Sequence, residues 1–370
     1  MRKQNGFNGY DYICTHVDDF KVVAINPTFW CDVFEQCFQL KVVEEPRYYL
    51  GSDYAYSKDN KAWKISCSTY VKECIKKLEA HPAVGGKLYG HKTSLPDGIH
   101  PEVDESEHLN DEKTHLYQQL LGCAQWANTL CRLDISFACS SLSRFLVNPR
   151  SEHLKLAFHL LGYIKKNPNQ GILIDSRPLL LDDELTKHTF HPDFLEDYPN
   201  ASEDIDSSLP EPFGEALQTS VFFDTDWAHD IATRRSIPGF IAMVGSTPLI
   251  WQSKRQNCIT TSTYCAEFIA MRSAVEESIS LRYMLRCLGI PVTEPTKVFG
   301  DNWRVIQSAS IPESELKKKH IAISYHYVQE AISAKIIDAY WVKSSENFAD
   351  ICTKALDGNS YGFIVNEVMV

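Results

Sequence analysis

Residues 221–230, VFFDTDWAHD, constrain the fold of this chain more than any other short stretch. Three apolar residues lead into Asp224 and Asp226, and side chains two positions apart lie on one face of a β-strand. If residues 221–223 form a strand, both carboxylates leave its end on the same face of a sheet, where they can meet a divalent metal ion. An isolated pair of this kind is more often a solvated strand end or an Asx-turn. The segments that follow decide between these interpretations.

The elements predicted after this strand each bring one more acidic residue. A hairpin of two strands around Gly245 is followed by an amphipathic helix with Glu267 in its second turn. A short strand then ends in Asp301, and a helix, a strand and the word ENFADICTKAL follow, the last carrying Asp350. Four carboxylates therefore occur at element ends in the order strand, helix, strand, helix. The alternation of strands and helices predicts an α/β domain.

This order, with the words DTDW, TSTYCAEF, GDN and FADICTKAL, resembles the ribonuclease H domain of copia-type retrotransposon polyproteins. The resemblance implies that Asp224, Glu267, Asp301 and Asp350 are the catalytic residues and metal ligands, with Asp226 in reserve. It also implies two Mg²⁺ ions, with Mn²⁺ as an alternative, and no small-molecule cofactor. Two magnesium ions about 3.5–4 Å apart activate the attacking water and stabilise the leaving oxygen of an RNA phosphodiester.

Further residues of the same domain are expected at the substrate. By the resemblance, Arg234 and Arg235 hold phosphates, because a guanidinium can bind a phosphate with two hydrogen bonds. Ser262 and Asn302 are expected beside the carboxylates. The substrate is expected to be an RNA–DNA hybrid, recognised by shape and by the 2′-hydroxyls of one strand.

Histidines give no clear signal in this domain. Some ribonucleases H place a histidine near the last aspartate, and this sequence has none between His326 and Asp350. His320 and His326 belong to a helix that resembles the family, but the sequence leaves open whether either assists catalysis.

Residues 1–82 resemble the end of a reverse transcriptase palm. The runs YDYICTHV and FKVVAI predict two strands joined by a tight turn at Asp18 and Asp19, like the YVDD hairpin of that family, with His16 in place of tyrosine. Nucleotide transfer in the family needs a further upstream aspartate and the fingers. We therefore expect that this chain alone does not polymerise DNA and that Asp18 and Asp19 are the remnant of a reverse transcriptase site.

Residues 83–114 are rich in Pro, Gly, His and acids without a period and are predicted to be irregular, whereas residues 116–174 are predicted to be mostly helical and resemble the segment between polymerase and ribonuclease H. The word CRLDI stands where the family has a phrase like TRPDI, with Leu133 replacing proline. The only chemistry expected here is contact of Arg132, Lys165 and Lys166 with phosphates.

Charge divides the chain in the same way. Of a net charge of −11, nearly all the excess lies in residues 175–218, which carry 12 acidic and 2 basic side chains. Residues 1–174 carry 20 of each and residues 219–358 carry 15 of each, so the global charge does not argue against nucleic-acid binding. The acidic segment predicts a mobile or loosely docked linker.

The predicted fold class is therefore α/β: a ribonuclease H-like mixed sheet with flanking helices, preceded by a partial reverse transcriptase palm and a helical connection. The predicted division is a partial palm in 1–82, a connection or thumb-like helical region in 83–174, an acidic linker in 175–218, a ribonuclease H-like domain in 219–358 and a tail in 359–370.

Composition indicates an intracellular chain, cytoplasmic or nuclear. The twelve cysteines form no CxxC or Cys/His cluster, which indicates reduced core residues. No apolar run reaches the roughly 18 residues of a membrane span, and the beginning of the chain lacks the order of a signal peptide. The expected partners are an RNA–DNA hybrid and other Pol chains, with no membrane.

Two other functions fit part of the sequence. A degenerate or domesticated copy would bind nucleic acid or protein and cut nothing. The departures at His16 and Leu133 favour this alternative, and the complete set of four carboxylates opposes it. An integrase or resolvase of the same fold would use similar acids, but the integrase pattern of two aspartates and a late glutamate does not fit Asp350.

Overall fold

The structure is a computed structural model of the chain. It describes residues 2–3, 9–42, 47–57, 61–181, 186–188, 198–311 and 321–370. Within these ranges the strands form one sheet of three strands, one of four and one of six. None of the helices in these ranges is long and apolar enough to cross a lipid bilayer.

The six-stranded sheet carries the predicted acidic residues. Its order is β11-β10-β9-β12-β13-β8, and its strands are β8 (Thr186–His188), β9 (Thr219–Asp226), β10 (Ile237–Val244), β11 (Thr247–Ser253), β12 (Thr296–Gly300) and β13 (Ile337–Val342). β9, β10 and β11 form an antiparallel meander, whereas β12 pairs in parallel with both β9 and β13. β8 lies at one edge of the sheet and pairs with β13 in the antiparallel direction. The sheet is mixed, as predicted, with the predicted turn at Gly245 between β10 and β11.

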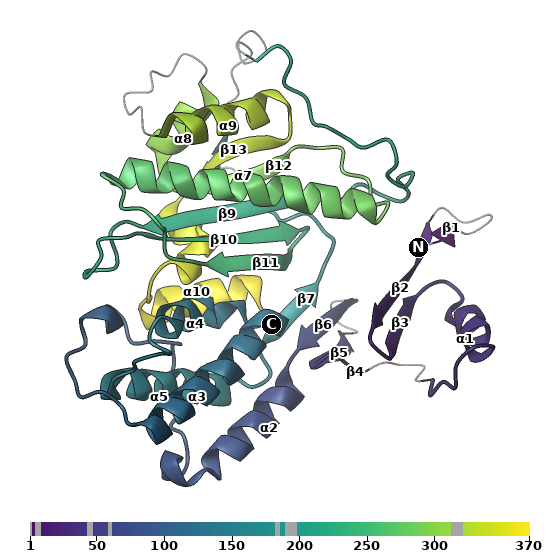
Figure 1. The fold of residues 1–370 in the computed structure, drawn as a ribbon. Helices are drawn as coiled ribbons and strands as arrows, with labels where there is room; N and C mark the ends of the chain where they lie inside the picture. Colours follow the sequence, from purple (N-terminus) through teal and green to yellow (C-terminus); the bar gives the residue numbers. More distant parts are fainter. Residues whose placement is uncertain are drawn as a thin grey trace.

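Helices cover both faces of this sheet (Figure 1), which confirms the predicted fold class. One face packs against α7 (Thr263–Cys287), α8 (Trp303–Ser310) and α9 (Ala322–Ser333). Neighbouring residues of β9 point to opposite faces: Val221 and Phe223 belong to the core under α7, and Phe222 belongs to the core on the other face. Asp224 and Asp226 share the face of Phe222.

The second face is covered by the predicted connection. Its helices are α3 (Asp111–Leu130), α4 (Ser136–Ser143) and α5 (Ser151–Lys166), joined by α10 (Gly358–Val368) at the end of the sequence. A single buried cluster contains Phe222 and Ile241 of the sheet, Leu142 of α4 and Tyr361 of α10. The connection and the sheet therefore share one hydrophobic core.

Residues 359–370 are not a tail, contrary to the prediction. They form most of α10, whose apolar side chains Tyr361, Ile364 and Val365 are buried. The backbones of Val370 and Gly171 exchange two hydrogen bonds, of 2.8 and 2.9 Å. The sequence did not predict that this helix is docked, because its apolar face packs against the connection, which lies far away in the sequence.

The remaining strands form two smaller sheets. The four-stranded sheet contains β4 (Tyr48–Tyr49), β5 (Ser52–Ser57), β6 (Ala62–Ser66) and β7 (Gly171–Ile174). Helix α2 (Ser68–Glu79) follows β6 in the sequence. The three-stranded sheet contains β1 (Arg2–Lys3), β2 (Tyr10–His16) and β3 (Asp19–Val23), and α1 (Pro27–Glu35) follows it. Short 3₁₀ helices are η1 (Pro82–Val84), η2 (Pro101–Val103), η3 (Leu133–Ile135), η5 (Ser344–Glu346) and η6 (Phe348–Cys352).

The hairpin of β2 and β3 forms as predicted, but its turn is shifted by one residue. The turn consists of Val17 and Asp18, and Asp19 is already in β3, paired with His16. Both aspartates are exposed. In Figure 1 this hairpin and α1 lie to the right of the main body.

Arg132 of the connection does not contact solvent, which corrects the expected phosphate contact. Its side chain is fully buried, and its Nε and Nη2 donate to the carboxylate of Asp134 at 2.9 and 2.8 Å. Tyr163 donates to the same carboxylate at 2.7 Å. Lys165 is also engaged, in an ion pair of 2.6 Å with Glu79. These basic residues stabilise the connection.

The described part of the acidic segment is docked, in contrast to the predicted loose linker. Glu203 forms ion pairs with Arg282 and Arg286 of α7. Burial acts to raise the pKa of Glu203, but the two guanidinium groups outweigh burial and bring that pKa to about 2. Part of the acidic charge of this segment is therefore neutralised by arginines of α7.

Candidate active site

Asp224 lies inside β9, because the strand continues to Asp226, beyond the predicted end. Its side chain is buried, and Gly239 of β10 is its antiparallel neighbour. The hydroxyl of Thr353 donates a hydrogen bond of 2.5 Å to its Oδ2. One carboxylate oxygen is therefore oriented by a residue 129 positions away.

Asp301 directly follows β12, the parallel neighbour of β9. Strands that run in parallel end at the same edge of the sheet, so Asp301 is brought beside the end of β9. Its Oδ2 accepts a hydrogen bond of 2.7 Å from Ser344. The next residue, Asn302, is the N-cap of α8, where its side chain accepts from the backbone N–H of Val305.

Asp350 is supplied by η6, which is fastened to β9 by Asn347. The Asn347 side chain donates to the carbonyl of Phe223 at 3.0 Å and accepts from the backbone N–H of Ala349 at 3.2 Å. Gly239 allows the close approach, because a Cβ at this position would lie 2.6 Å from the Cβ of Cys352. Because Gly239 has no side chain, η6 can pack closely on β10 and bring Asp350 beside Asp224.

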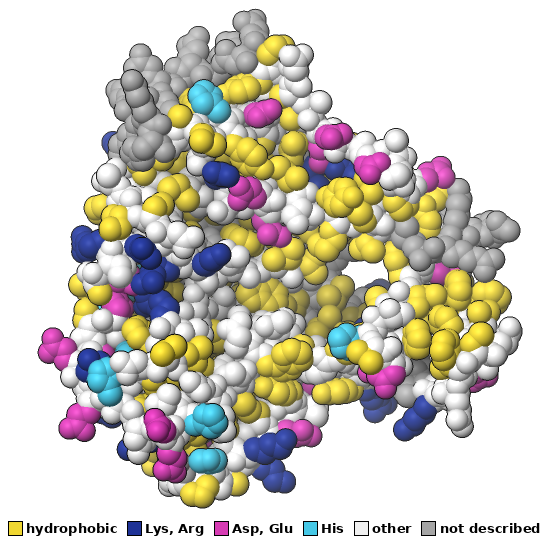
Figure 2. Space-filling view, in the orientation of Figure 1, with side chains coloured by type: hydrophobic (Ala, Val, Ile, Leu, Met, Phe, Trp, Pro, Cys, Tyr) yellow, Lys and Arg dark blue, Asp and Glu magenta, His cyan; other side chains and the backbone are white. Residues whose placement is uncertain are grey.

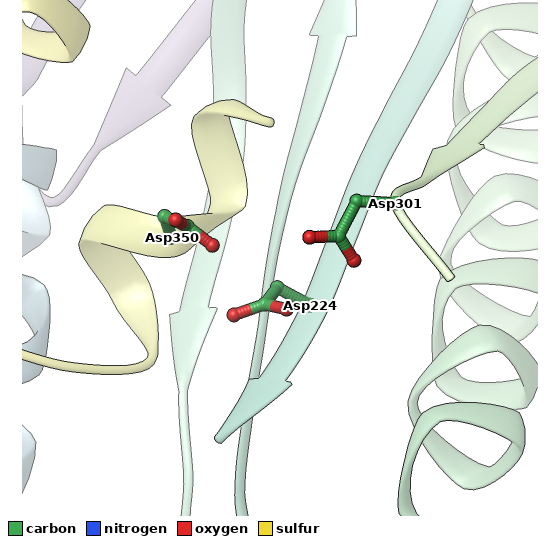
Figure 3. A group of neighbouring side chains, drawn as sticks. All are labelled: Asp224, Asp301 and Asp350. Atoms are coloured by element: carbon green, nitrogen blue, oxygen red, sulfur yellow. The ribbon is translucent and has the colours of Figure 1, made fainter. Parts of the chain in front are cut away.

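Figure 3 shows the three aspartates turned toward one another. One carboxylate oxygen from each of Asp224, Asp301 and Asp350 lies within 4.8 Å of the others. Burial and the charge of Asp224 raise the pKa of Asp301, and the same two causes raise the pKa of Asp350 to about 8. Clustered oxygen ligands suit a hard divalent cation, whose charge would relieve this repulsion. The residues present therefore fit a divalent metal ion.

Glu267 lies near this group but is not a member of it. It is in the second turn of α7 and is 5% exposed, and its Oε2 makes no hydrogen bond. Burial, followed by the charges of Asp224 and Asp301, raises its pKa well above the ordinary value. Of the four expected acids, three aspartates therefore converge, and the buried glutamate lies close enough for their charges to raise its pKa.

Lys354 is part of the site and was missed by the sequence analysis. Its Nζ lies 3.0 Å from Oδ1 of Asp350 and 3.8 Å from Oδ2 of Asp224. Burial acts to lower the pKa of Lys354, but the two aspartates outweigh burial and raise it. The signal in the sequence was a lysine four residues after an expected ligand, on the same side of a helical turn. Lys354 is an internal counter-ion of the carboxylates.

The expected phosphate ligands lie on the loop after β9. Arg234 is exposed and has a left-handed φ of 57°, and Arg235 is half-buried. The loop is held by the buried carboxylate of Asp230, which accepts 2.5 Å hydrogen bonds from Arg144 of the connection and from Arg255. Figure 2 shows Lys and Arg side chains gathered on the left side of this face of the molecule.

Ser262 and Asn302, expected beside the substrate, both have structural roles. Each is the N-cap of a helix, and its side chain accepts a hydrogen bond from the backbone N–H three residues later. The Nδ1 of His326 lies 2.7 Å from the hydroxyl oxygen of Tyr198. His320 is outside the described residues.

Asp226 is engaged by His229, a second residue that the sequence analysis did not single out. Its Oδ2 lies 2.6 Å from Nδ1 of His229. Asp226 does not belong to the group of three aspartates. Asp226 lies two residues after Asp224, on the same face of β9 but nearer the end of the strand.

No protein-family model matches the chain. It is similar over nearly its whole length to copia-type retrotransposon Pol polyproteins, which confirms the resemblance. It is 24% identical over 97% of its length to the retrovirus-related Pol polyprotein from transposon RE1 of Arabidopsis thaliana, and 22% identical over 96% to that from transposon TNT 1-94 of Nicotiana tabacum. The chain spans 22% and 24% of these relatives, about a fifth to a quarter of their length.

Two solved structures align with part of the chain. The amino-terminal ribonuclease H domain of a Mycobacterium tuberculosis protein matches 41% of this chain and 98% of its own length, with 15% identity and a TM-score of 0.30. The ribonuclease H1 of Halobacterium salinarum matches 38% of this chain and 95% of its own, with 12% identity and a TM-score of 0.27.

Proposed function

We propose that this chain is a metal-dependent ribonuclease H-type endonuclease that cuts the RNA strand of RNA–DNA hybrids. The observation that carries the proposal is the convergence of Asp224, Asp301 and Asp350, three carboxylates from distant segments. Burying like charges together is unfavourable unless a cation joins them. Similarity to Pol polyproteins along the chain supports a nucleic-acid substrate.

The metal ligands in this proposal are the three aspartates, with Glu267 beside them. Bound Mg²⁺, or Mn²⁺ in its place, would lower the pKa of the attacking water and stabilise charge on the leaving oxygen. The chain's own residues keep the carboxylates in place: Thr353 orients Asp224, and Ser344 orients Asp301. Glu267 is buried beside them, and its Oε2 makes no hydrogen bond.

Arg234 and Arg235 are proposed to bind substrate phosphates near the carboxylates. Their loop is anchored at Asp230, whose carboxylate accepts hydrogen bonds from Arg144 and Arg255, so the guanidinium groups lose little backbone freedom on binding. Because such contacts release counterions, hybrid binding should weaken steeply as salt concentration rises.

We assign no nucleotide transfer to Asp18 and Asp19. Both are exposed at a hairpin end, and among the described residues no third acidic or histidine ligand joins them in a group that could hold a metal ion. Two carboxylates and water do not position a nucleotide. Primer extension on an RNA template, with Asp18→Ala/Asp19→Ala as the control, tests this assignment.

The test of the proposed function is cleavage of a hybrid whose RNA strand is end-labelled, with single-stranded RNA and duplex DNA as comparison substrates. Cleavage of the hybrid that requires Mg²⁺ and stops with EDTA is the expected result. Equal cleavage of all three substrates, or cleavage in EDTA, would contradict the proposal.

A second candidate is a non-catalytic copy that binds nucleic acid or protein. The observation that favours it is the position of Glu267 outside the group of three, because a site for two metal ions needs more ligands than a site for one. Hybrid binding without cleavage in either Mg²⁺ or Mn²⁺ would support this candidate over the enzyme. Association with other Pol chains is a further proposal, which sedimentation of the purified chain would test.

A further inference from the structure

Four cysteines of the described chain meet in two pairs between α2 and α3. A thiol hydrogen bond joins Cys67 to Cys131, and a second one joins Cys74 to Cys123. Cys67 is the N-cap of α2 and Cys131 is the C-cap of α3, so the two helices run antiparallel along this contact. About two helical turns separate the cysteines of each helix. The two pairs therefore form two rungs between the same two helices, and all four thiols are free.

The helices lie close enough for a covalent bond at the second rung. Cα atoms of α2 and α3 approach one another within 8 Å. The hydroxyl of Tyr70, on α2, donates a hydrogen bond of 3.2 Å to the backbone carbonyl of Cys123, on α3. A disulfide usually spans roughly 4.4–6.8 Å between Cα atoms. A bond between the sulfurs of Cys74 and Cys123 thus requires only a small approach of the helices.

Access to solvent distinguishes the two pairs. Cys67 and Cys131 are both 0% exposed. Cys74 is 9% exposed, and Cys123 is half-buried at the edge of the same core. An oxidant must reach a sulfur atom, and fully buried cysteines are inert for this reason. The pair of Cys74 and Cys123 is therefore the reactive one.

Cys123 is the better nucleophile of this pair. The hydrogen bond from the thiol of Cys74 lowers the pKa of Cys123, burial opposes this shift, and the charge of Lys77 supports it. The same hydrogen bond, together with burial, raises the pKa of Cys74. The thiolate is the reactive form of a cysteine, and a neighbouring thiol can then resolve the oxidised sulfur. Cys123 and Cys74 match these two roles.

We propose that Cys74 and Cys123 are a peroxide-reactive dithiol, which closes into a reversible disulfide and fastens α2 to α3. The Cys123 thiolate attacks one oxygen of hydrogen peroxide, an S–O bond forms, the O–O bond breaks, and the released hydroxide takes up the proton that Cys123 lost. The sulfur of Cys74 then attacks Sγ of Cys123, the S–O bond breaks, and the departing hydroxide takes the proton of Cys74. Two thiols and one peroxide give one disulfide and two waters, with two electrons passing from sulfur to oxygen. A dithiol reductant reverses the reaction by thiol–disulfide exchange.

The experiment follows the oxidation of the whole chain by hydrogen peroxide. The purified chain is reduced, freed of reductant and treated with one molar equivalent of peroxide, and the remaining thiols are alkylated at several times. Peptides are mapped by mass spectrometry without reduction, and thermal unfolding is measured before and after addition of dithiothreitol. The variants are Cys123→Ser and Cys74→Ala. Cys258→Ser is the matched control, because Cys258 is an exposed cysteine in the loop before α7.

In the wild-type chain, the peptides of Cys74 and Cys123 should become linked on the order of tenfold faster than Cys258 is oxidised. The melting temperature should rise by several degrees and return with dithiothreitol, because the bond closes a long loop. Cys123→Ser should abolish the link and the rise and leave Cys74 reduced. Cys74→Ala should leave a sulfenic acid on Cys123, which dimedone traps. Cys258→Ser should behave as the wild type does.

Oxidation of Cys258 ahead of the pair would overturn the proposal, as would sulfinic acid on Cys123 of the wild-type chain without any disulfide. A first disulfide between Cys67 and Cys131 would overturn it too, because access would then not decide which pair reacts. If Cys74→Ala does not fold, Cys123→Ser at its half-buried position still decides, since a persisting rise in melting temperature contradicts the assignment. Hybrid cleavage plays no part in these measurements, so the dithiol and the proposed function are tested independently.

Discussion

Asp301 is the residue at which the charge of the site can be removed with least change of shape. Asp301→Asn should lower hydrolysis by orders of magnitude, because it removes a metal ligand charge. Without metal the same change should raise the melting temperature, because burial and the charge of Asp224 raise the pKa of Asp301 and show that its ionised form is disfavoured. Hybrid cleavage and thermal unfolding in EDTA measure the two effects.

Glu330→Gln is the matched control, since Glu330 is exposed on α9. It should change neither cleavage nor the melting temperature appreciably. Cleavage by Asp301→Asn at the wild-type rate would remove Asp301 from the proposed site.

The raised pKa of Asp350 predicts how metal affinity depends on pH. In the metal-free protein this carboxyl holds its proton up to about pH 8, whereas its ordinary pKa is 3.8. The folded chain thus binds more protons, so this group's contribution to stability is lost as pH rises through about 8. Mg²⁺ binds the ionised form, so its affinity should rise with pH until about 8 and its binding should release protons.

Calorimetric titration of Mg²⁺ in buffers with different ionisation enthalpies measures this proton release. An affinity that is constant from about pH 6 to 9, with no release of protons, would contradict the prediction.

Lys354 should compete with the metal ion for Asp350. Lys354→Met removes the competing cation while keeping most of the apolar stem, and Mg²⁺ should then bind on the order of tenfold more tightly, ~1.4 kcal/mol. The metal-free protein should melt at a lower temperature, because the three aspartates lose their only internal counter-ion among the described residues. Lys155→Met, at an exposed position on α5, is the control. Weaker Mg²⁺ binding by Lys354→Met would show that Lys354 supports the metal site.

At the scale of elements, the contact between β10 and η6 decides where Asp350 lies. Gly239→Ala would place a Cβ 2.6 Å from the Cβ of Cys352 and 3.0 Å from its backbone carbon. Backbone atoms cannot yield as a flexible side chain does, so η6 must shift and carry Asp350 away from Asp224. We expect a loss of stability of about 1–3 kcal/mol and weaker Mg²⁺ binding.

Gly122→Ala is the control for this change, because Gly122 lies within α3 and a Cβ there meets nothing within 4 Å. That substitution should stabilise the chain by roughly 0.5–1 kcal/mol through helix propensity. Chemical denaturation of both variants measures the difference. Full Mg²⁺ affinity in Gly239→Ala would mean that η6 is not held by this contact.

At the scale of the molecule, the sheet and the connection form one folding unit. α4 and α10 lie against the face of the sheet opposite α7, and Tyr361 of α10 donates to the backbone carbonyl of Asp134 at 2.7 Å. A fragment of residues 219–370 would keep α10 but lack α3, α4 and α5, so it would expose the part of that face and of α10 that these helices cover, and it should aggregate or remain unfolded. The whole chain should protect β9 and α3 against hydrogen exchange to a similar degree. A folded fragment that binds Mg²⁺ would contradict a shared core.

The sequence by itself determined the order and type of most elements. The apolar run before Asp224, the turn at Gly245 and the helical periodicity around Glu267 are local patterns, and each predicts structure within a few neighbouring residues. The same patterns placed Asp224, Asp301 and Asp350 near the ends of elements. Chemistry then restricted their use, because clustered carboxylates suit a hard cation.

Only the tertiary structure decided which residues meet. The distance of Glu267 from the three aspartates, the counter-ion Lys354, the cysteine pairs between α2 and α3 and the docking of α10 all depend on segments far apart in the chain. Thr353 reaches Asp224 across 129 positions, and Tyr361 reaches Asp134 across 227. Periodicity tells which face of an element is apolar but does not name the partner of that face. That choice is made by packing and strand pairing across the whole chain.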